Sequence, residues 1–289
     1  MRLTTYHDAG EFLARTREVL ASNEIANNLM LGLASRLAAS PQTSGAPPYL
    51  ATVDQDGELI AAALMTPPYP VTLYRSDAAA TQVEAVFGLI ARDLVSHNWP
   101  VRSVSGRSPF AEEFTRVWAA HTGASARVAM RERIYELRQV IPARPVPGQI
   151  RAATQADLEL VTQWAGEFFA EALPDDPPAD ARDVAARRIA SGDIFLWEDG
   201  GRPVSMAAKT RGMITVICVN LVYTPPPLRG RGYASACVAA LSQHLLDVGW
   251  KSCALFTDLA NPTSNSIYQK IGYKPVCDFD QYAFDVELA

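Results

Sequence analysis

The chain has 289 residues, of which 48% are hydrophobic and 20% are charged. This composition is typical of a globular protein and excludes a disordered, collagen-like or disulfide-dense chain. The length allows about two domains of roughly 150 residues each. Because the sequence has neither an apolar run of roughly 18 residues nor a secretion signal over residues 1–10, we expect a cytoplasmic protein with no membrane partner.

The net charge of −5 comes entirely from the second half of the chain. Residues 1–149 hold 14 arginines, no lysine and 14 acidic residues, whereas residues 150–289 hold 12 basic and 17 acidic residues. A nucleic-acid-binding protein would show a basic face, so we expect no nucleic-acid partner. The acidic excess mildly favours a cationic substrate, although solubility is the simpler interpretation.

The cysteines and histidines show no metal-ligand spacing, and we predict buried free thiols and no metal site. These scattered residues are Cys218, Cys237, Cys253, Cys277, His7, His97, His121 and His244.

Strand-like and helix-like patterns alternate in the first half. The predicted helices cover residues 9–20, 24–38, 79–96 and 111–120, and the predicted strands cover 49–54, 59–65, 71–74, 101–105 and 127–137. A segment with three prolines and a glycine follows at residues 141–149, and such a composition is typical of a linker. We therefore predict one domain over residues 1–141, a linker over 142–149 and a second domain over 150–289.

The second half repeats nearly the same order. Thr154 and Asp157 resemble a capping box, and the glycine-rich turn at 198–203 predicts a hairpin. Asn261-Pro262 predicts a helix start and Gly272 a helix end. The predicted helices cover about 154–172, 184–190, 229–248 and 261–271, and the predicted strands cover 194–197, 204–209, 213–224, 252–257 and one or two strands within 273–288. Two tandem modules of mixed α/β class are expected, with one continuous mixed sheet as the alternative.

The strongest local feature is the loop between the strand at 213–224 and the following helix. Gly230 and Gly232 carry no Cβ where the backbone must approach a ligand, and the first-turn amides of a helix attract anions. Arg229 and Arg231 can add positive charge. A diphosphate is the natural ligand of such a loop. Two alternatives are a simple glycine turn and a dinucleotide site using Asp258, but Ser235 occupies the third glycine position of the dinucleotide fingerprint.

The motif Arg229-x-x-Gly232-x-Ala234 resembles the [QR]-x-x-G-x-[GA] signature of the GNAT superfamily of N-acetyltransferases. The segment from Asn261 through Tyr268 to Gly272-Tyr273 resembles that superfamily's N-x-x-[SA]-x-x-x-Y-x-x-x-G-[FY] segment. The resemblance implies two GNAT-like modules, each with a mixed, mostly antiparallel sheet flanked by helices. It also implies acetyl-CoA as co-substrate, with its diphosphate on the amides of 230–234 and its pantetheine arm along 222–224. The coenzyme-binding residues so implied are Val222, Tyr223, Thr224, Arg229, Gly230, Arg231, Gly232, Tyr233, Ala234, Asn261 and Ser264.

By the same resemblance, Tyr268 is the general acid that protonates the leaving thiolate; as an alternative, it is a half-buried helix aromatic. Asn261 is a helix cap first and a coenzyme contact second. The general base is not identified, and the candidate carboxylates are Glu167, Glu171, Asp278 and Asp280. No cysteine lies in the matched catalytic stretch, so we expect direct transfer without an acyl-enzyme.

The first module departs from the motif at the corresponding loop. Residues 74–80 hold no glycine, and Asp77 would repel a diphosphate. Trp118 occupies the place of Tyr268, and an indole NH is a poor proton donor. We therefore expect this module to be a diverged, inactive copy that supports the second.

The function expected from the resemblance is transfer of acetyl from acetyl-CoA to a primary amine of a small molecule. Alternatives are a mycothiol-synthase-like acyltransferase, a protein acetyltransferase and a non-catalytic acyl-CoA sensor. We expect a monomer or a homodimer.

Overall fold

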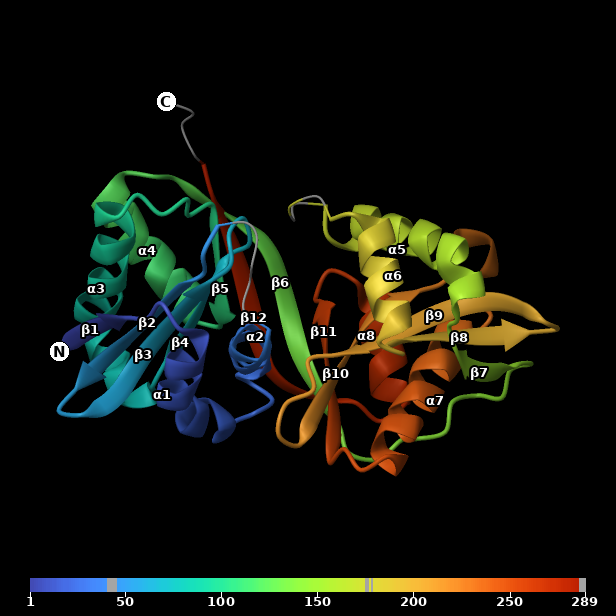
Figure 1. Ribbon diagram of the computed structural model, residues 1–289. Helices are drawn as coiled ribbons and strands as arrows, with labels where there is room; N and C mark the ends of the chain where they lie inside the picture. The colour runs from blue at the N-terminus through green and yellow to red at the C-terminus, as the bar shows by residue number, and fades with distance from the viewer. Residues whose placement is uncertain (41–45, 175–176, 178, 286–289) are drawn as a thin grey trace. The chain divides into compact units, whose positions relative to one another are not determined.

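The computed structural model describes residues 1–40, 46–174, 177 and 179–285. Contacts divide the chain into two units: unit 1 holds Met1–Ile134 and the chain from Val276 onward, and unit 2 holds Tyr135–Pro275. The helices and strands of both units are labelled in Figure 1. The domain boundaries expected from the sequence, with a linker over residues 142–149, remain a prediction.

The two units show the same order of elements. Unit 1 contains β1 (Arg2–Thr5), α1 (Ala9–Ala21), α2 (Asn28–Ala39), β2 (Tyr49–Gln55), β3 (Glu58–Met65), β4 (Val71–Arg75), α3 (Val83–Ser96), β5 (Ser103–Arg107), α4 (Phe110–Thr122) and most of β6 (Ala126–Leu137). Unit 2 contains β7 (Gln149–Ala152), α5 (Leu158–Ala172), α6 (Ala181–Ala190), β8 (Ile194–Asp199), β9 (Arg202–Thr210), β10 (Val216–Tyr223), α7 (Tyr233–Asp247), β11 (Ser252–Asp258), α8 (Pro262–Lys270) and the start of β12 (Lys274–Phe284). The predicted repetition and the mixed α/β class are confirmed.

Each unit has a mixed, mostly antiparallel set of strands, as predicted. In unit 1, β1 to β4 pair antiparallel in sequence order, and β5 then pairs parallel with β4. In unit 2, β7 to β10 pair antiparallel in sequence order, and β11 pairs parallel with β10. The parallel pair places a helix, α3 or α7, in the crossover between its two strands.

The last strand of the chain returns to unit 1. β12 pairs antiparallel with β5, from Phe279 opposite Arg107 to Ala283 opposite Ser103. Conversely, Tyr135 and Leu137 at the end of β6 belong to the hydrophobic core of unit 2. The chain therefore enters unit 2 through β6 and leaves it through β12.

Unit 2 has two apolar cores because its strands are buried on both faces. Phe195 of β8 packs into one core together with α7 and α8. Its neighbours Ile194 and Leu196 pack into the other core together with α5 and α6. This alternation follows from the two-residue period of a strand, so that helices cover both faces of the sheet.

Several local predictions are confirmed. Thr154 and Asp157 form the capping box before α5, and the β8–β9 hairpin turns at Gly200 and Gly201, both with positive φ. Asn261 accepts a hydrogen bond from Ser264 N at 3.0 Å and caps α8, with Pro262 in the first turn.

Other boundaries differ from prediction. Helix α7 begins at Tyr233 rather than at Arg229, because Gly230 and Gly232 adopt positive φ. Helix α3 begins at Val83, after a 3-10 turn over Asp77–Gln82. The short strands β1 and β7 have no counterpart among the predicted elements. The end of the strand predicted within 273–288 lies partly outside the described residues.

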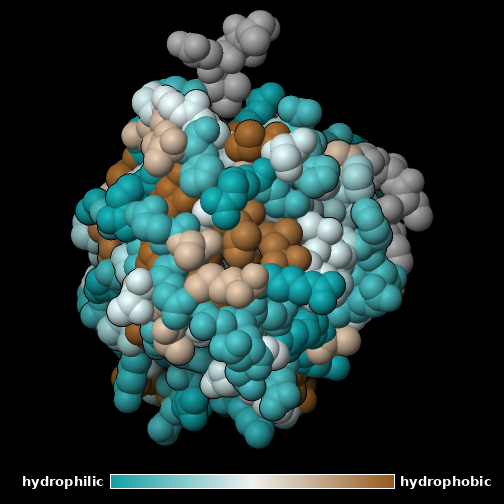
Figure 2. Space-filling model, turned by 90° about the vertical axis from the view of Figure 1, so that its left-hand side faces the viewer, coloured by the Kyte–Doolittle hydropathy of each residue, from teal (hydrophilic) through white to brown (hydrophobic). Residues whose placement is uncertain are grey.

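The face of the molecule in Figure 2 is mainly hydrophilic, with apolar residues gathered near the middle of the view and at a few other places. Among the described residues, no helix has both the length and the apolar character needed to span a bilayer. Cys218, Cys237 and Cys253 are free and buried, as predicted, whereas Cys277 is only partly buried.

Candidate active site

Strand β10 changes its pairing at its carboxyl end. Its residues Val216 to Cys218 pair parallel with β11, and its antiparallel pairing with β9 shifts between Asn220 and Tyr223. Leu221 lies in this bulge with φ of 51°. Since a non-glycine residue rarely adopts such a φ, the bulge is a local strain that the surrounding packing maintains. The bulge redirects the backbone at residues 221–222, where an extended ligand could add to the strand.

The loop after β10 forms an open cradle. Gly230 has φ of +77°, and a Cβ placed on it would meet no atom within 4 Å. Gly232 is the N-cap of α7 in the left-handed conformation, and no side chain caps this helix. The first-turn amides of α7 therefore have no side-chain acceptor in the described structure. Together with the helix dipole they favour an anion at this point.

The guanidinium of Arg229 is occupied within the protein. It donates to Glu171 of α5 at 2.7 Å and, through Nε, to the carbonyl oxygen of Thr224 at 2.9 Å. It also lies over the ring of Tyr223, 5.6 Å from its centre. The side chain thus holds the end of β10 and the start of the loop together, and its charge is shared with Glu171. Arg231 is exposed, and its guanidinium donates to Pro227 O at 3.2 Å.

Glu167 of α5 contacts the side chain of Tyr223. Hydrogen bonds from Gln163 and from Tyr223 lower the pKa of Glu167. Burial and the same hydrogen bond to Glu167 raise the pKa of Tyr223 to about 12. Tyr223 is further packed against Trp164, with ring centres 6.3 Å apart. Two of the four candidate bases, Glu167 and Glu171, therefore lie at the end of β10.

The other two candidate bases lie in unit 1. Asp278 accepts two hydrogen bonds from Arg133, at 2.6 and 3.0 Å. Asp280 is buried, and burial raises its pKa. Asp280 is on the part of β12 that pairs with β5, and Asp278 immediately precedes that part.

Helix α8 is held at the end of β11 by Asn265. Its side-chain amide donates to Asp258 O and to Asn261 O, each at 2.8 Å. Its oxygen accepts a hydrogen bond from the Tyr135 hydroxyl at 2.9 Å. Sequence reasoning missed Tyr135, because its partner is 130 residues away and no local pattern marks it.

Tyr268 on α8 lies in the core of unit 2 and is 8% exposed. Burial raises the pKa of its hydroxyl, so the phenol keeps its proton at neutral pH. Within the described part of the chain the hydroxyl makes no hydrogen bond. Its ring packs edge-on against Tyr273, with centres 6.0 Å apart. The side chain is therefore fixed by packing in the core of unit 2.

The corresponding end of β4 in unit 1 is filled. Arg75 is 4% exposed and donates two hydrogen bonds to Glu113 of α4, at 3.0 and 3.2 Å. Arg75 and Arg107 both lie over the ring of Phe110, 4.7 and 5.0 Å from its centre. Asp77 is exposed at the start of the following 3-10 turn.

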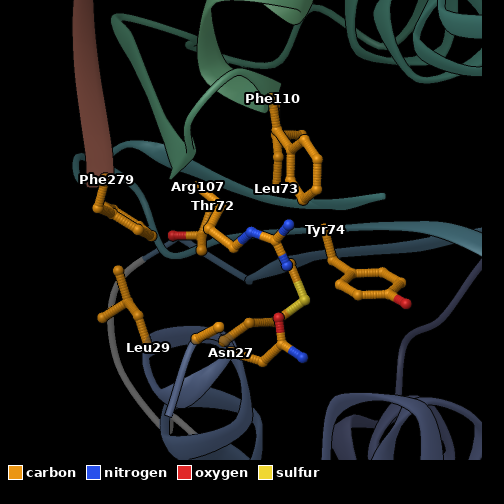
Figure 3. A pocket seen from close by; sticks show the side chains of 10 residues that line it. Asn27, Leu29, Thr72, Leu73, Tyr74, Arg107, Phe110 and Phe279 are labelled. Carbon is orange, nitrogen blue, oxygen red and sulfur yellow. The ribbon is translucent and has the colours of Figure 1, made fainter. Parts of the chain in front are cut away.

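A small pocket remains beside this end of β4. It lies among Asn27, Thr72, Tyr74, Arg107 and Phe279, with Arg107 near the middle of Figure 3. Its volume is about 10 Å³, room for roughly one water molecule.

The residues expected to bind coenzyme A are brought together in unit 2. Those from 222 to 234 form one continuous strand end, loop and helix start. Asn261 and Ser264 lie at the start of α8, which follows the parallel neighbour of that strand. The open space at Gly230 and the uncapped amides of α7 fit a diphosphate. Among the described residues, no group of three histidine, cysteine or acidic side chains could hold a metal ion.

Comparisons with known proteins agree with this geometry. The model of the acetyltransferase (GNAT) family matches residues 158–273, whereas no curated protein matches the chain in sequence. A GCN5-related N-acetyltransferase from Sphaerobacter thermophilus has a TM-score of 0.64 at 15% identity, over 97% of this chain and 94% of its own. A GNAT-family acetyltransferase from Colwellia psychrerythraea has a TM-score of 0.62 at 12% identity, over 99% and 100%.

A tandem GNAT protein from the clavulanic acid biosynthesis pathway has a TM-score of 0.58 at 13% identity, over 98% of each chain. At these identities the structural likeness shows the fold, and it extends over both units. Residues 158–273 therefore form a domain that matches the acetyltransferase (GNAT) family, and the fold of the whole chain is similar to that of GNAT proteins, a tandem one among them.

Proposed function

We propose that unit 2 transfers the acetyl group of acetyl-CoA to a primary amine of a small molecule, with Tyr268 as general acid. The observation that carries the proposal is the bulge at Leu221 followed directly by the cradle at Gly230 and Gly232. The first feature offers a strand end to the pantetheine amides. The second offers amides to the diphosphate. Their order along one chain segment matches the order of these groups in the coenzyme.

The coenzyme contacts are proposed to come mainly from backbone amides. Arg229 contributes through its backbone, because its guanidinium already binds Glu171 and Thr224 O. Arg231 is the exposed cation of the loop and supplements the amides. Asn261 keeps its role as the cap of α8, and Ser264 lies beside it in the first turn.

The transfer needs two proton movements. The attacking amine loses a proton and forms a bond to the carbonyl carbon, and the bond from that carbon to sulfur then breaks. Tyr268 donates its phenolic proton to the departing thiolate. An amide near Val222 could polarise the thioester carbonyl during the attack.

Glu167 is better suited to attracting the acceptor than to removing its proton. Its pKa is lowered by Gln163 and Tyr223, so it is a weak base that stays charged at neutral pH. Glu171 already shares its charge with Arg229. Two carboxylates beside one guanidinium favour an acceptor that arrives as an ammonium ion, and water then takes its proton.

Unit 1 is proposed not to bind the coenzyme. The Arg75–Glu113 pair and Phe110 occupy the end of β4, and the adjacent pocket has room for about one water. Asp77, which lies 3.7 Å from Arg107 Nη2 and is otherwise exposed, places a carboxylate at the start of the 3-10 turn, where a diphosphate would have to bind. We propose a supporting role for this unit.

A non-catalytic acyl-CoA sensor is the second candidate, and the deep packing of Tyr268 favours it. Thiol release from acetyl-CoA, measured against a panel of amines and peptides, separates the two functions. An enzyme that acts on small molecules releases thiol with amines and not with peptides. Binding of coenzyme A by calorimetry without thiol release from any acceptor would favour the sensor, and no binding at all would contradict both.

A further inference from the structure

The proline-rich segment between β6 and β7 is tied to unit 2 at both ends. At one end, Ile141 N donates to Ile271 O at 2.9 Å. At the other, the Trp197 indole donates to Pro147 O at 2.9 Å, and Gly148 approaches Glu198 so closely that a Cβ on it would lie 2.4 Å from the Glu198 carbonyl oxygen. A free linker would show no such close approaches. The segment is therefore a fixed part of unit 2.

Within this segment, Val146 lies directly against the phosphate-binding loop proposed above. A Cβ placed on Gly232 would come within 3.0 Å of the Val146 Cγ1 atom. Ala143, three residues earlier, packs against the core that contains α7 and α8. Prolines hold the backbone extended, and an extended proline-rich chain repeats every three residues. Ala143 and Val146 thus present the same side of the segment to unit 2.

Contact with Val146 limits the backbone movement of Gly232, which as a glycine would otherwise have many accessible conformations. Gly232 has φ of +87° and Gly230 has φ of +77°, and glycine has the largest conformational freedom of all residues. A ligand that binds a mobile loop must order it, which weakens binding, whereas a loop held in place beforehand binds more tightly. A side chain behind Gly232 provides this restraint without occupying the open space at Gly230.

We propose that Val146 is a positioning residue for coenzyme binding, acting through Gly232 to hold the loop in the conformation that receives the diphosphate. This inference rests on the proposed function. It makes a segment that has the composition of a linker part of the coenzyme site.

The test compares two thioesters in the full chain. Val146→Ala should raise KM for acetyl-CoA about threefold to tenfold, the effect expected from losing one ordering contact, with kcat unchanged. It should leave the kinetics with S-acetyl-pantetheine unchanged, because this thioester lacks the diphosphate. Val140→Ala is the matched control, since Val140 packs on the same core and is not the residue that Gly232 meets. It should change neither KM.

A second variant tests the coupling. Gly232→Ala should raise KM for acetyl-CoA by a larger factor, and Val146→Ala in that background should lower it again by making room for the new methyl group. If Val146→Ala affects both thioesters alike or neither, or if the double variant shows no relief, Val146 does not act through the loop and the inference is overturned. If Gly232→Ala leaves KM for acetyl-CoA unchanged, the phosphate site itself is misplaced and the proposed function fails.

Discussion

Units 1 and 2 share one order of elements but differ at the end of the strand that precedes the crossover helix. In unit 1, β4 pairs with β3 in regular register as far as Arg75, and Arg75 turns inward to Glu113 and Phe110. In unit 2, β10 has a bulge at Leu221. The fold alone does not make a binding site. The strained end of β10 leaves the space beside it open, whereas side chains fill the space beside the regular end of β4.

The loops that follow differ in the same sense. Unit 2 has two left-handed glycines before α7, whereas unit 1 has a 3-10 turn with an exposed Asp77 before α3. The aromatic residues of the last helices also differ: Trp118 is packed between Phe114 and Phe284, with ring centres 5.9 and 5.7 Å away, whereas Tyr268 keeps an unpaired hydroxyl. Both units therefore pack an aromatic residue of the last helix, but the glycine loop and the unpaired hydroxyl are found in unit 2.

The largest expected effect, on kcat, comes from the contrast between Tyr268 and Trp118. Tyr268→Phe removes the proposed proton donor and should lower kcat by about 100-fold or more, with KM for acetyl-CoA nearly unchanged. Trp118→Phe in unit 1 should leave kcat unchanged in the fraction that is folded. Because burial raises the Tyr268 pKa, the wild-type kcat should show no loss from deprotonation of this residue as the pH rises to about 10. Steady-state kinetics with both variants measures these effects. Full activity of Tyr268→Phe would show that Tyr268 only packs in the core.

The ion pairs at the two strand ends should differ in their contribution to stability. Glu113→Ala leaves the buried guanidinium of Arg75 without its partner and should lower the free energy of unfolding by about 3 kcal/mol. Glu171→Ala breaks a pair in which Arg229 and Glu171 are 47% and 48% exposed, and it should cost less than about 1 kcal/mol. Chemical denaturation of both variants measures the difference. Equal losses of unfolding free energy would show that the Arg75–Glu113 pair is not more buried from water than the Arg229–Glu171 pair.

The first helices of the two units differ in how they are capped. Hydrogen bonds from Arg151 lower the pKa of Asp157 to about 2, below its ordinary value of 3.8. Asp157→Asn should therefore cost about 2 kcal/mol at pH 7. Because the native pKa is lowered, this contribution is complete above about pH 4 and disappears as the pH falls through 2.

Asp8 of unit 1 caps α1 by accepting from Glu11 N at 2.9 Å. Asp8→Asn should cost less than about 0.5 kcal/mol, since asparagine is an equally good cap. Urea denaturation of both variants at several pH values tests the contrast. A pH-independent loss for Asp157→Asn would argue against the ion pair as its source.

Two glycines with the same backbone conformation should lose the same stability on substitution but differ in their effect on binding. Gly230 and Gly57 have φ of +77° and +88°, and a Cβ on either would meet nothing within 4 Å. Gly230→Ala and Gly57→Ala should each lower the free energy of unfolding by about 1 kcal/mol, the cost of left-handed backbone. Only Gly230→Ala should raise KM for acetyl-CoA, by about fivefold. An equal rise in both variants would mean that the loop of unit 2 has no special role.

Much of the fold could be predicted from residues close together in sequence. The capping box of Thr154 and Asp157, the cap at Asn261 and the hairpin at Gly200-Gly201 each depend on a few neighbouring residues. The short strands β1 and β7 could not be predicted, because four residues are too few to establish an alternation of polarity and they pair with strands tens of residues away. The start of α7 was placed too early, since an arginine beside a glycine resembles a helix start as well as a loop.

The features of the candidate site also divide into those set by local sequence and those set by tertiary contacts. The sequence by itself determined the loop at 229–234, the helix start at Asn261 and the presence of Tyr268 seven residues later, because spacing within one segment is a local property. Only the tertiary structure decided that β12 belongs with β5, that Arg229 is paired with Glu171 and that Val146 lies against Gly232. Each of these contacts joins residues far apart in the chain, and which distant groups meet depends on how strands and helices pack rather than on their own conformational preferences.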